Sequence, residues 1–164
     1  MIEITRLHDK LRAKVQYFFT EQWGSSEMVI SSGVYDCSQL DGFAALDEED
    51  NIVGLITFDR KETELEIISL DSLLEGRGIG GMLLEQVERL ARTEQRSVIS
   101  LITTNDNLNA LKFYQKRGYQ LSKLFPNAVD EARKIKPSIP FIGEHGIPLH
   151  DELQLVKKLY GEEE

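Results

Sequence analysis

Apolar and polar residues follow two different periods along this chain, and these periods predict strands and helices in turn. Alternating or continuous apolar runs predict strands at 2–4, 42–46, 52–59, 64–70, 97–103, 119–124 and 152–159. Helical spacing of apolar residues predicts helices at 9–23, 80–94 and 108–117, and the polar stretch 130–134 fits a short fourth helix. The turns between the strands from 42 to 70 are so short that these strands must be antiparallel neighbours. We therefore expect an α/β domain.

Two stretches interrupt this pattern. Within residues 25–41, Met28–Ile30 fits a strand, whereas Val34–Cys37 is expected to form a loop. All four prolines lie within residues 126–148, and proline can neither donate to a sheet ladder nor sit inside a helix. Most of that segment is therefore expected to be irregular. Because it is also rich in apolar residues, we expect it to pack as one wall of a binding pocket.

Composition and charge narrow the class of protein. The length of 164 residues suits one domain, 1–164, and the 41% share of hydrophobic residues is typical of a globular chain. Residues 1–82 carry 7 Lys and Arg against 16 Asp and Glu, whereas residues 83–164 carry 12 of each. The net charge of −9 therefore belongs to the first half, which argues against a nucleic-acid partner and would attract a cation such as an amine. A solvated acidic surface without a partner is the alternative interpretation.

Cysteine content and hydropathy predict a cytoplasmic protein. Cys37 is the only cysteine, which excludes an internal disulfide and suits a reducing compartment. No apolar run approaches the ~20 residues of a membrane span, and the first residues lack the layout of a signal peptide, so no membrane partner is expected. His145 and His150, with Glu144, offer too few ligands for a metal site, so no metal is predicted.

The strongest chemical signal is the glycine cluster at residues 76–81, which stands between a predicted strand and a predicted helix. Glycines there let backbone N–H groups approach a ligand, and the helix adds the positive end of its dipole, which suits a phosphate. Gly76, Gly78 and Gly81 also match the dinucleotide fingerprint. That interpretation is less favoured, because the cluster follows antiparallel strands and the next strand lacks an acidic residue at the required place.

A second motif lies on the next predicted helix. Residues 107–119 read Asn-x-x-Ala-x-x-Phe-Tyr-x-x-x-Gly-Tyr. Together with the turn at 75–80, this motif resembles the GNAT superfamily of acetyl-coenzyme A-dependent N-acetyltransferases, in which the turn reads Gln/Arg-x-x-Gly-x-Gly/Ala. Glu75 stands where that motif has Gln or Arg, which predicts a weaker hold on the pyrophosphate unless Arg77 compensates.

The resemblance implies a fold and a cofactor site. The fold would be a single α/β domain with a mixed, mostly antiparallel sheet of about seven strands and three to four helices, in which the fourth and fifth strands splay into a notch. Acetyl-coenzyme A (acetyl-CoA) would lie in that notch, held by Leu70, Ser72, Arg77, Gly78, Ile79, Gly80, Gly81, Met82, Asn105 and Asn109. Tyr114 would be the general acid that protonates the departing thiolate.

The reaction also needs a proton acceptor, because an alkylamine near pH 7 is protonated and cannot attack a thioester. Glu64 and Glu66 share one face of their strand by alternation and precede the proposed cofactor-binding stretch. Glu66 is the favoured base, with Glu64 or a chain of waters as alternatives. Cys37 has no nucleophile motif around it, so the acetyl group is expected to pass directly to the amine in a ternary complex.

The predicted function is transfer of an acetyl group from acetyl-CoA to a primary amine, on a small cationic metabolite or on a protein. Residues 126–148, including Glu144 and His145, would lie on the acceptor side, and the resemblance also allows a homodimer. Two alternatives stay open, a non-catalytic module that senses coenzyme A and a dinucleotide-dependent enzyme. The identity of the acceptor does not follow from the sequence.

Overall fold

The structure is a computed structural model that describes residues 1–160. These residues group into two compact parts. The first part consists of residues 1–28 and 36–99, and the second of residues 29–35 and 100–160.

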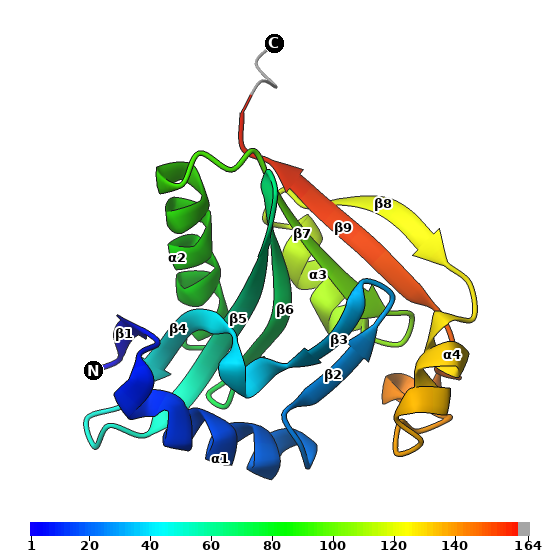
Figure 1. Cartoon of the computed structure of the whole chain (residues 1–164), viewed down its shortest axis with the longest axis horizontal. Coiled ribbons are helices and arrows are strands. Elements are labelled where there is room, and N and C mark those ends of the chain that lie inside the picture. The colour runs from blue at the N-terminus through cyan, green and yellow to red at the C-terminus, as the bar shows by residue number, and fades with distance from the viewer. Residues whose placement is uncertain (161–164) are drawn as a thin grey trace. The chain divides into compact units, whose positions relative to one another are not determined.

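The first part is an antiparallel sheet with two helices (Figure 1). Its strands are paired in the order β1 (Glu3–Arg6), β4 (Asp41–Leu46), β5 (Ile52–Lys61) and β6 (Glu64–Ser72). Its helices are α1 (Arg12–Trp23), which continues a 3-10 turn at Asp9–Leu11, and α2 (Ile79–Thr93). A Cβ on Gly54 of β5 would lie 2.5 Å from the side chain of Ile79, so α2 packs directly against one face of this sheet.

The second part carries the remaining elements. Its strands are β8 (Gln120–Phe125), β9 (Glu152–Lys158) and most of β7 (Val98–Thr104), and its helices are α3 (Leu108–Gln115) and α4 (Ala128–Ile135). The strands β8 and β9 pair antiparallel. The side chain of Asn107 caps α3 by accepting a hydrogen bond of 3.1 Å from the Ala110 N–H.

The sequence-based prediction of the fold class is confirmed. Seven strands form one mixed sheet in the order β1-β4-β5-β6-β7-β9-β8, and the described residues contain four α-helices. Two further strands, β2 (Glu27–Ile30) and β3 (Gly33–Asp36), form a separate two-stranded sheet. The predicted strand at Met28–Ile30 is therefore also confirmed.

The prediction of a loop at Val34–Cys37 is wrong. Residues Gly33–Asp36 form β3, and Cys37–Gln39 form a 3-10 turn. Val34 and Tyr35 have high strand propensity, and the polar residues before them supply a hairpin turn that brings β3 beside β2. Because β3 is only four residues long, its pattern is too short to distinguish a strand from a loop.

The proline-rich segment 126–148 is irregular over most of its length, as predicted. Its one α-helix, α4, is three residues longer than the predicted stretch 130–134, since it spans eight residues from Ala128 to Ile135. After α4 the segment contains only an isolated bridge between Ile142 and Pro148 and a 3-10 turn at Glu144–Gly146.

Candidate active site

The glycine turn between β6 and α2 leads into a helix whose first backbone donors have no intrahelical acceptors. Gly76 and Gly78 have φ of 72° and 70°, a region that favours glycine, and a Cβ on either would have no described heavy atom within 4 Å. Gly78 is the N-cap of α2, and the Met82 N–H donates to its carbonyl at 3.0 Å. The N–H groups of residues 79–81 precede this first helical bond, so they lack intrahelical acceptors. Together with the helix dipole, they form a place for a phosphate.

The other predicted cofactor residues divide between the two parts of the molecule. Leu70 and Ser72 lie at the end of β6, directly before the glycine turn, in the first part. Asn105 and Asn109 lie in the second part, together with the predicted general acid Tyr114. Asn109 is an exposed residue of α3.

The side chain of Asn105 is engaged within the second part. Its Oδ1 accepts hydrogen bonds from the backbone N–H groups of His150 and Asp151, at 3.1 and 3.0 Å. Its Nδ2 donates to the Pro148 carbonyl at 2.8 Å. These bonds tie the end of β7 to the segment that precedes β9. The backbone N–H of Asn105 also donates to the Asp151 carbonyl at 3.0 Å, so a role of Asn105 toward a cofactor would fall to its positioning of this segment.

Tyr114 is packed among aromatic rings. Its ring is buried, with edge contacts to Phe113 and Tyr119 at centroid distances of 5.0 and 5.4 Å. The Tyr114 carbonyl also accepts the Tyr119 N–H at 3.1 Å. This packing holds the ring rigidly at the end of α3, which suits a group that must present a phenol in one orientation.

A shift in strand register brings two carboxyl groups to the same face of the sheet. Glu66 lies opposite Asp59 of β5, and Asp71 lies opposite Leu55, whereas Ile68 is an extra residue without a partner on β5. Since opposite residues share a face, Glu66 and Asp71 point to the same side although they are five positions apart. Simple alternation from Glu66 would place Asp71 on the opposite face.

Between these carboxyl groups the same face carries a buried pair of hydroxyl groups. Thr57 and Ser69 are opposite one another, and their side-chain oxygens lie 2.5 Å apart. Buried polar side chains are uncommon in the middle of a sheet unless they have partners or a function. This face of β5 and β6 therefore carries a row of polar groups within an otherwise apolar core.

Glu66, the base predicted from the sequence, has a counter-ion. Its side chain is 3% exposed, and its carboxylate forms an ion pair with the Lys61 ammonium of β5. Glu64, the alternative base, is only partly buried at the start of β6. The lysine compensates the charge of Glu66, which is what a buried carboxylate requires.

Asp71 is a candidate that the sequence analysis missed. One carboxyl oxygen, Oδ1, accepts a hydrogen bond of 3.2 Å from the Trp23 indole N–H of α1. The other, Oδ2, is buried and has no hydrogen-bond partner among the residues that the structure describes. Burial raises the pKa of Asp71 to about 6, against a smaller opposing effect of the Trp23 bond. The only sequence signal was an acidic residue at the end of an apolar strand, since Trp23 is 48 positions away.

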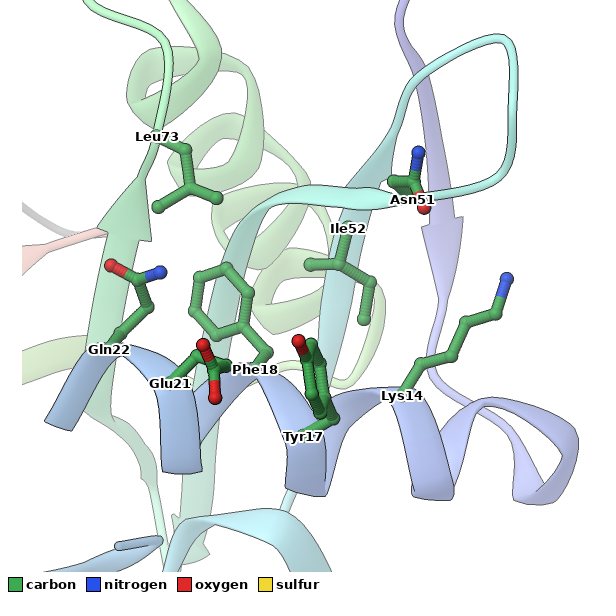
Figure 2. A pocket seen from close by; sticks show the side chains of 8 residues that line it. All are labelled: Lys14, Tyr17, Phe18, Glu21, Gln22, Asn51, Ile52 and Leu73. Atoms are coloured by element: carbon green, nitrogen blue, oxygen red, sulfur yellow. The ribbon is translucent and has the colours of Figure 1, made fainter. Parts of the chain in front are cut away.

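A cavity opens along α1, beside the end of β6. Figure 2 shows it between α1, the residues at the start of β5 and Leu73, and its volume is about 340 Å³. Phe18, Ile52 and Leu73 give it an apolar lining, and Lys14 and Glu21 add one charge of each sign. Leu73 follows Asp71 by two positions on the chain, so the cavity belongs to the neighbourhood of the polar row.

A second cavity, of about 610 Å³, lies within the second part. It is lined by residues of β2, the end of β8 and α4. The proline-rich segment contributes Pro126, Ala132 and Ile135 to the lining. Arg133 fastens this segment, because its guanidinium donates to the carbonyls of Ile139, Pro140 and Leu149 at 3.1, 2.8 and 2.7 Å.

Asp106 holds the turn that contains Glu144 and His145. The Asp106 Oδ2 accepts the Glu144 N–H at 2.8 Å, and a Cβ on Gly143 would lie 2.1 Å from the same oxygen. His145 has φ of 59°, and the turn has no buried residues. Among residues 1–160, no group of three or more His, Cys, Asp or Glu is placed to hold a metal ion. Each helix in this range is too short or too polar to cross a membrane.

A strand that ends in a glycine turn, followed by a helix whose first N–H groups lack intrahelical acceptors, is suited to bind a phosphate group. The comparison with known families agrees. The chain belongs to the acetyltransferase (GNAT) family, whose pattern matches residues 9–119, and it is an acyltransferase by that membership.

Comparisons with individual proteins identify a sequence relative and solved structures of the same fold. The uncharacterized protein YxbD of Bacillus subtilis (strain 168) is 55% identical over 145 residues, which cover 88% of this chain and 91% of that protein. Among solved structures, the IAA acetyltransferase from Bacillus cereus ATCC 14579 matches 97% of this chain and 100% of its own with a TM-score of 0.71 at 19% identity. A GNAT family acetyltransferase from Elizabethkingia anophelis with acetyl-CoA bound matches 96% and 98% with a TM-score of 0.69 at 20% identity.

Proposed function

We propose that this protein transfers the acetyl group of acetyl-CoA directly to a primary amine within a ternary complex. The observation that carries the proposal is the set of backbone N–H groups at residues 79–81 that lack intrahelical acceptors, behind a glycine turn at the position of the family's turn motif. It agrees with the similar acetyltransferase that holds acetyl-CoA. Acetyl-CoA is a substrate in this scheme, and its pyrophosphate would rest on these donors.

The proposal gives each predicted residue a role toward the donor. The backbone of Leu70 and Ser72 would hold the pantetheine arm, and the Leu70 N–H would polarise the thioester carbonyl. The N–H groups of residues 77–81 would hold the pyrophosphate, whereas the predicted Met82 N–H is engaged by the Gly78 carbonyl. Asn109, which is exposed on α3, would contact the adenosine side. Asn105 would act by fixing the segment before β9.

The proton steps follow from the chemistry of the exchange. The ammonium of the acceptor loses one proton to a carboxylate on β6, and the neutral nitrogen attacks the thioester carbonyl carbon. When the C–S bond breaks, the Tyr114 phenol donates its proton to the thiolate and recovers a proton from the new amide nitrogen. The products are an N-acetyl amine, free coenzyme A and one proton released through the carboxylate.

The acceptor is proposed to be cationic. The excess of acidic residues falls within 1–82, which include the polar row on β6 and the cavity along α1. Glu21 at that cavity would pair with a second positive charge, so small molecules with two amines and lysine side chains are the first acceptors to try. The cavity lined by residues 126–135 is the alternative place for the body of the acceptor.

The donor site can be tested by a pair of glycine variants. Gly78→Ala should weaken acetyl-CoA binding at least tenfold in calorimetry, because it strains the turn and fills the space above the donors. Gly146→Ala is a matched control, since Gly146 has φ of 72° and equally open surroundings but lies elsewhere. Equal losses in both variants, or a thermal shift with NAD and none with acetyl-CoA, would contradict the proposal. Binding of acetyl-CoA without thiol release on any amine would favour the sensor module instead.

A further inference from the structure

We propose that Asp71, and not Glu66, accepts the proton of the acceptor amine. This inference rests on the proposed function, since it names the proton acceptor of that reaction. It adds a catalytic residue that the motifs do not indicate, and it makes Trp23 the residue that positions it. Asp71, Trp23 and Glu66 all lie in the first part of the molecule.

The carboxyl group of Asp71 has a hydrogen-bond donor at one oxygen and none at the other among the described residues. Its Oδ1 is fixed by the Trp23 indole N–H at 3.2 Å, whereas Oδ2 is buried with no partner among the described residues. A buried carboxyl oxygen without a donor is costly, and native proteins rarely keep one without a function. An ammonium group would supply the missing donor and the compensating charge together.

The position of Asp71 on β6 favours the same role. It stands between Leu70 and Ser72, whose backbone is proposed to hold the pantetheine arm of the donor. A group that receives the amine proton has to lie within hydrogen-bond reach of the attacking nitrogen, directly or through one water. Asp71 is one residue from Leu70, whose N–H is proposed to polarise the thioester carbonyl, so its carboxyl group belongs to the strand segment nearest the proposed reaction.

Glu66 is less suited to be the first acceptor. Lys61 already compensates its charge, so an incoming ammonium would compete with a resident cation. The pair Thr57 and Ser69 also lies between Glu66 and Asp71 on this face, which places Glu66 further from the donor-binding end of β6. Glu66 then acts as a positioning residue that holds Lys61.

The surroundings of Asp71 explain its readiness to take a proton near neutral pH. Leu55 faces it from β5 and Trp23 from α1. The charged groups of β5 and β6 on the same sheet face are Asp59, Lys61, Glu64 and Glu66. Glu21 is the acidic residue of α1 that lines the neighbouring cavity. Burial is the main cause that raises the pKa of Asp71 to about 6, which leaves it mostly ionised at pH 7 and still a competent base.

The step balances without a further reactant. A proton leaves the acceptor ammonium for Oδ2, which gives a neutral amine and a neutral carboxylic acid. The nitrogen lone pair forms the C–N bond as the C–S bond breaks, and the sulfur receives its proton from Tyr114. The Tyr114 phenolate then takes the excess proton of the new amide nitrogen. The carboxylic acid then returns its proton to water, and Asp71 is ionised for the next cycle.

The test compares the pH dependence of kcat/KM for the wild type and four variants, of which Glu66→Gln is one, measured by thiol release with a diamine and a lysine-containing peptide. The wild type should show a rising limb with an apparent pKa of about 6. Asp71→Asn should lose that limb and about 100-fold or more in kcat. Trp23→Phe should shift the limb to higher pH, because the indole bond favours the ionised form. Asp59→Asn, which alters an acidic residue of the same face, should keep the limb.

Two results would overturn the assignment. One is an Asp71→Asn variant that keeps both the limb and the rate, and the other is a limb that disappears in Glu66→Gln but not in Asp71→Asn. A wild type that binds acetyl-CoA and acetylates neither amine would refute the proposed function instead. In that case an NMR titration of the Asp71 carboxyl resonance, assigned by its absence in Asp71→Asn, still tests the inference. Added butylammonium should lower the pH midpoint of this titration. An unchanged midpoint would overturn the inference.

Discussion

At the scale of single residues, the molecule places one carboxyl group where water solvates it poorly. Asp71 has a pKa raised to about 6 by burial, whereas the hydrogen bonds of Arg60 lower the pKa of Glu94 to about 2. Ionisation of Asp71 is less favourable in the folded than in the unfolded state, whereas ionisation of Glu94 is more favourable in the folded state. Their contributions to stability therefore change in opposite directions as the pH rises.

Asp71 should make the folded protein less stable as the pH rises. Its folded-state pKa lies above the unfolded value, so its contribution is complete below about pH 4 and is lost as the pH passes through about 6. A shift from 3.8 to about 6 corresponds to at most about 3 kcal/mol. Asp71→Asn should therefore be more stable than the wild type at pH 7.5 and similar to it at pH 4.5. Urea unfolding at both pH values measures this difference, and equal differences at the two would contradict it.

At the scale of elements, the contact between β5 and α2 leaves no room for a methyl group. The nearest atoms to a Cβ on Gly54 belong to Ile79 at 2.5 Å and Leu83 at 3.2 Å. Gly54→Ala should cost about 1–3 kcal/mol in the free energy of unfolding, because overpacked cores strain their neighbours.

A double-mutant cycle gives the control for this contact. Ile79→Ala alone should be destabilising, since Ile79 is 1% exposed, but the double variant with Gly54→Ala should lose less than the sum of the single losses. Strictly additive losses in urea unfolding would show that the two side chains do not share this space.

The segment 126–148 depends on one arginine. Arg133 is 8% exposed, donates to three backbone carbonyls of the segment that follows it, and lies over the Phe141 ring at 4.3 Å. Arg133→Met keeps most of the bulk but leaves those carbonyls without their donor, at a cost of about 2–3 kcal/mol. Hydrogen exchange should increase at residues 139–149 in this variant. The exposed Lys134→Met is the matched control, and equal exchange in both variants would refute the role of Arg133.

The elements themselves were largely predictable, because most of them are long enough to show a period. The helices at residues 12–23, 79–93 and 108–115 each bury one side, and the three strands from 41 to 72 are joined by short polar turns. The four-residue strand β3 was not predictable as a strand, since its stability comes from pairing with β2.

The site was predictable only where a motif marks it. The glycine turn follows from its composition, but Asp71 becomes a candidate through a bond to a residue 48 positions away and through the extra residue Ile68. Neither the Trp23 bond nor the extra residue can be recognised from the local pattern of apolar and polar residues. The side chain of Asn105, which the family resemblance assigns to the cofactor, is engaged by the segment before β9, a contact that also spans more than 40 positions.

At the scale of the whole molecule, the charge is divided along the chain. The first 82 residues account for the net charge of −9, and they contain the donor turn, the polar row and Asp71. Phosphate binding by a chain of this charge has to depend on backbone N–H groups and the helix dipole more than on cationic side chains. Arg77 is the basic residue of the turn itself, and Glu75 opposes it.

The extra residue in β6 has a consequence for how this chain can change during evolution. Ile68 shifts the alternation of β6 by one residue. Every side chain after Ile68 therefore points to the face opposite to the one that strict alternation would give it. Substitutions at Ile68 keep the extra residue and leave these directions unchanged. Deletion of one residue at this point would restore regular pairing between β5 and β6 and turn Asp71 toward α2. Such a deletion would keep the strand and remove the carboxyl group from its tryptophan. The face to which Asp71 points is thus set by the number of residues in β6 and not by the identity of any one side chain.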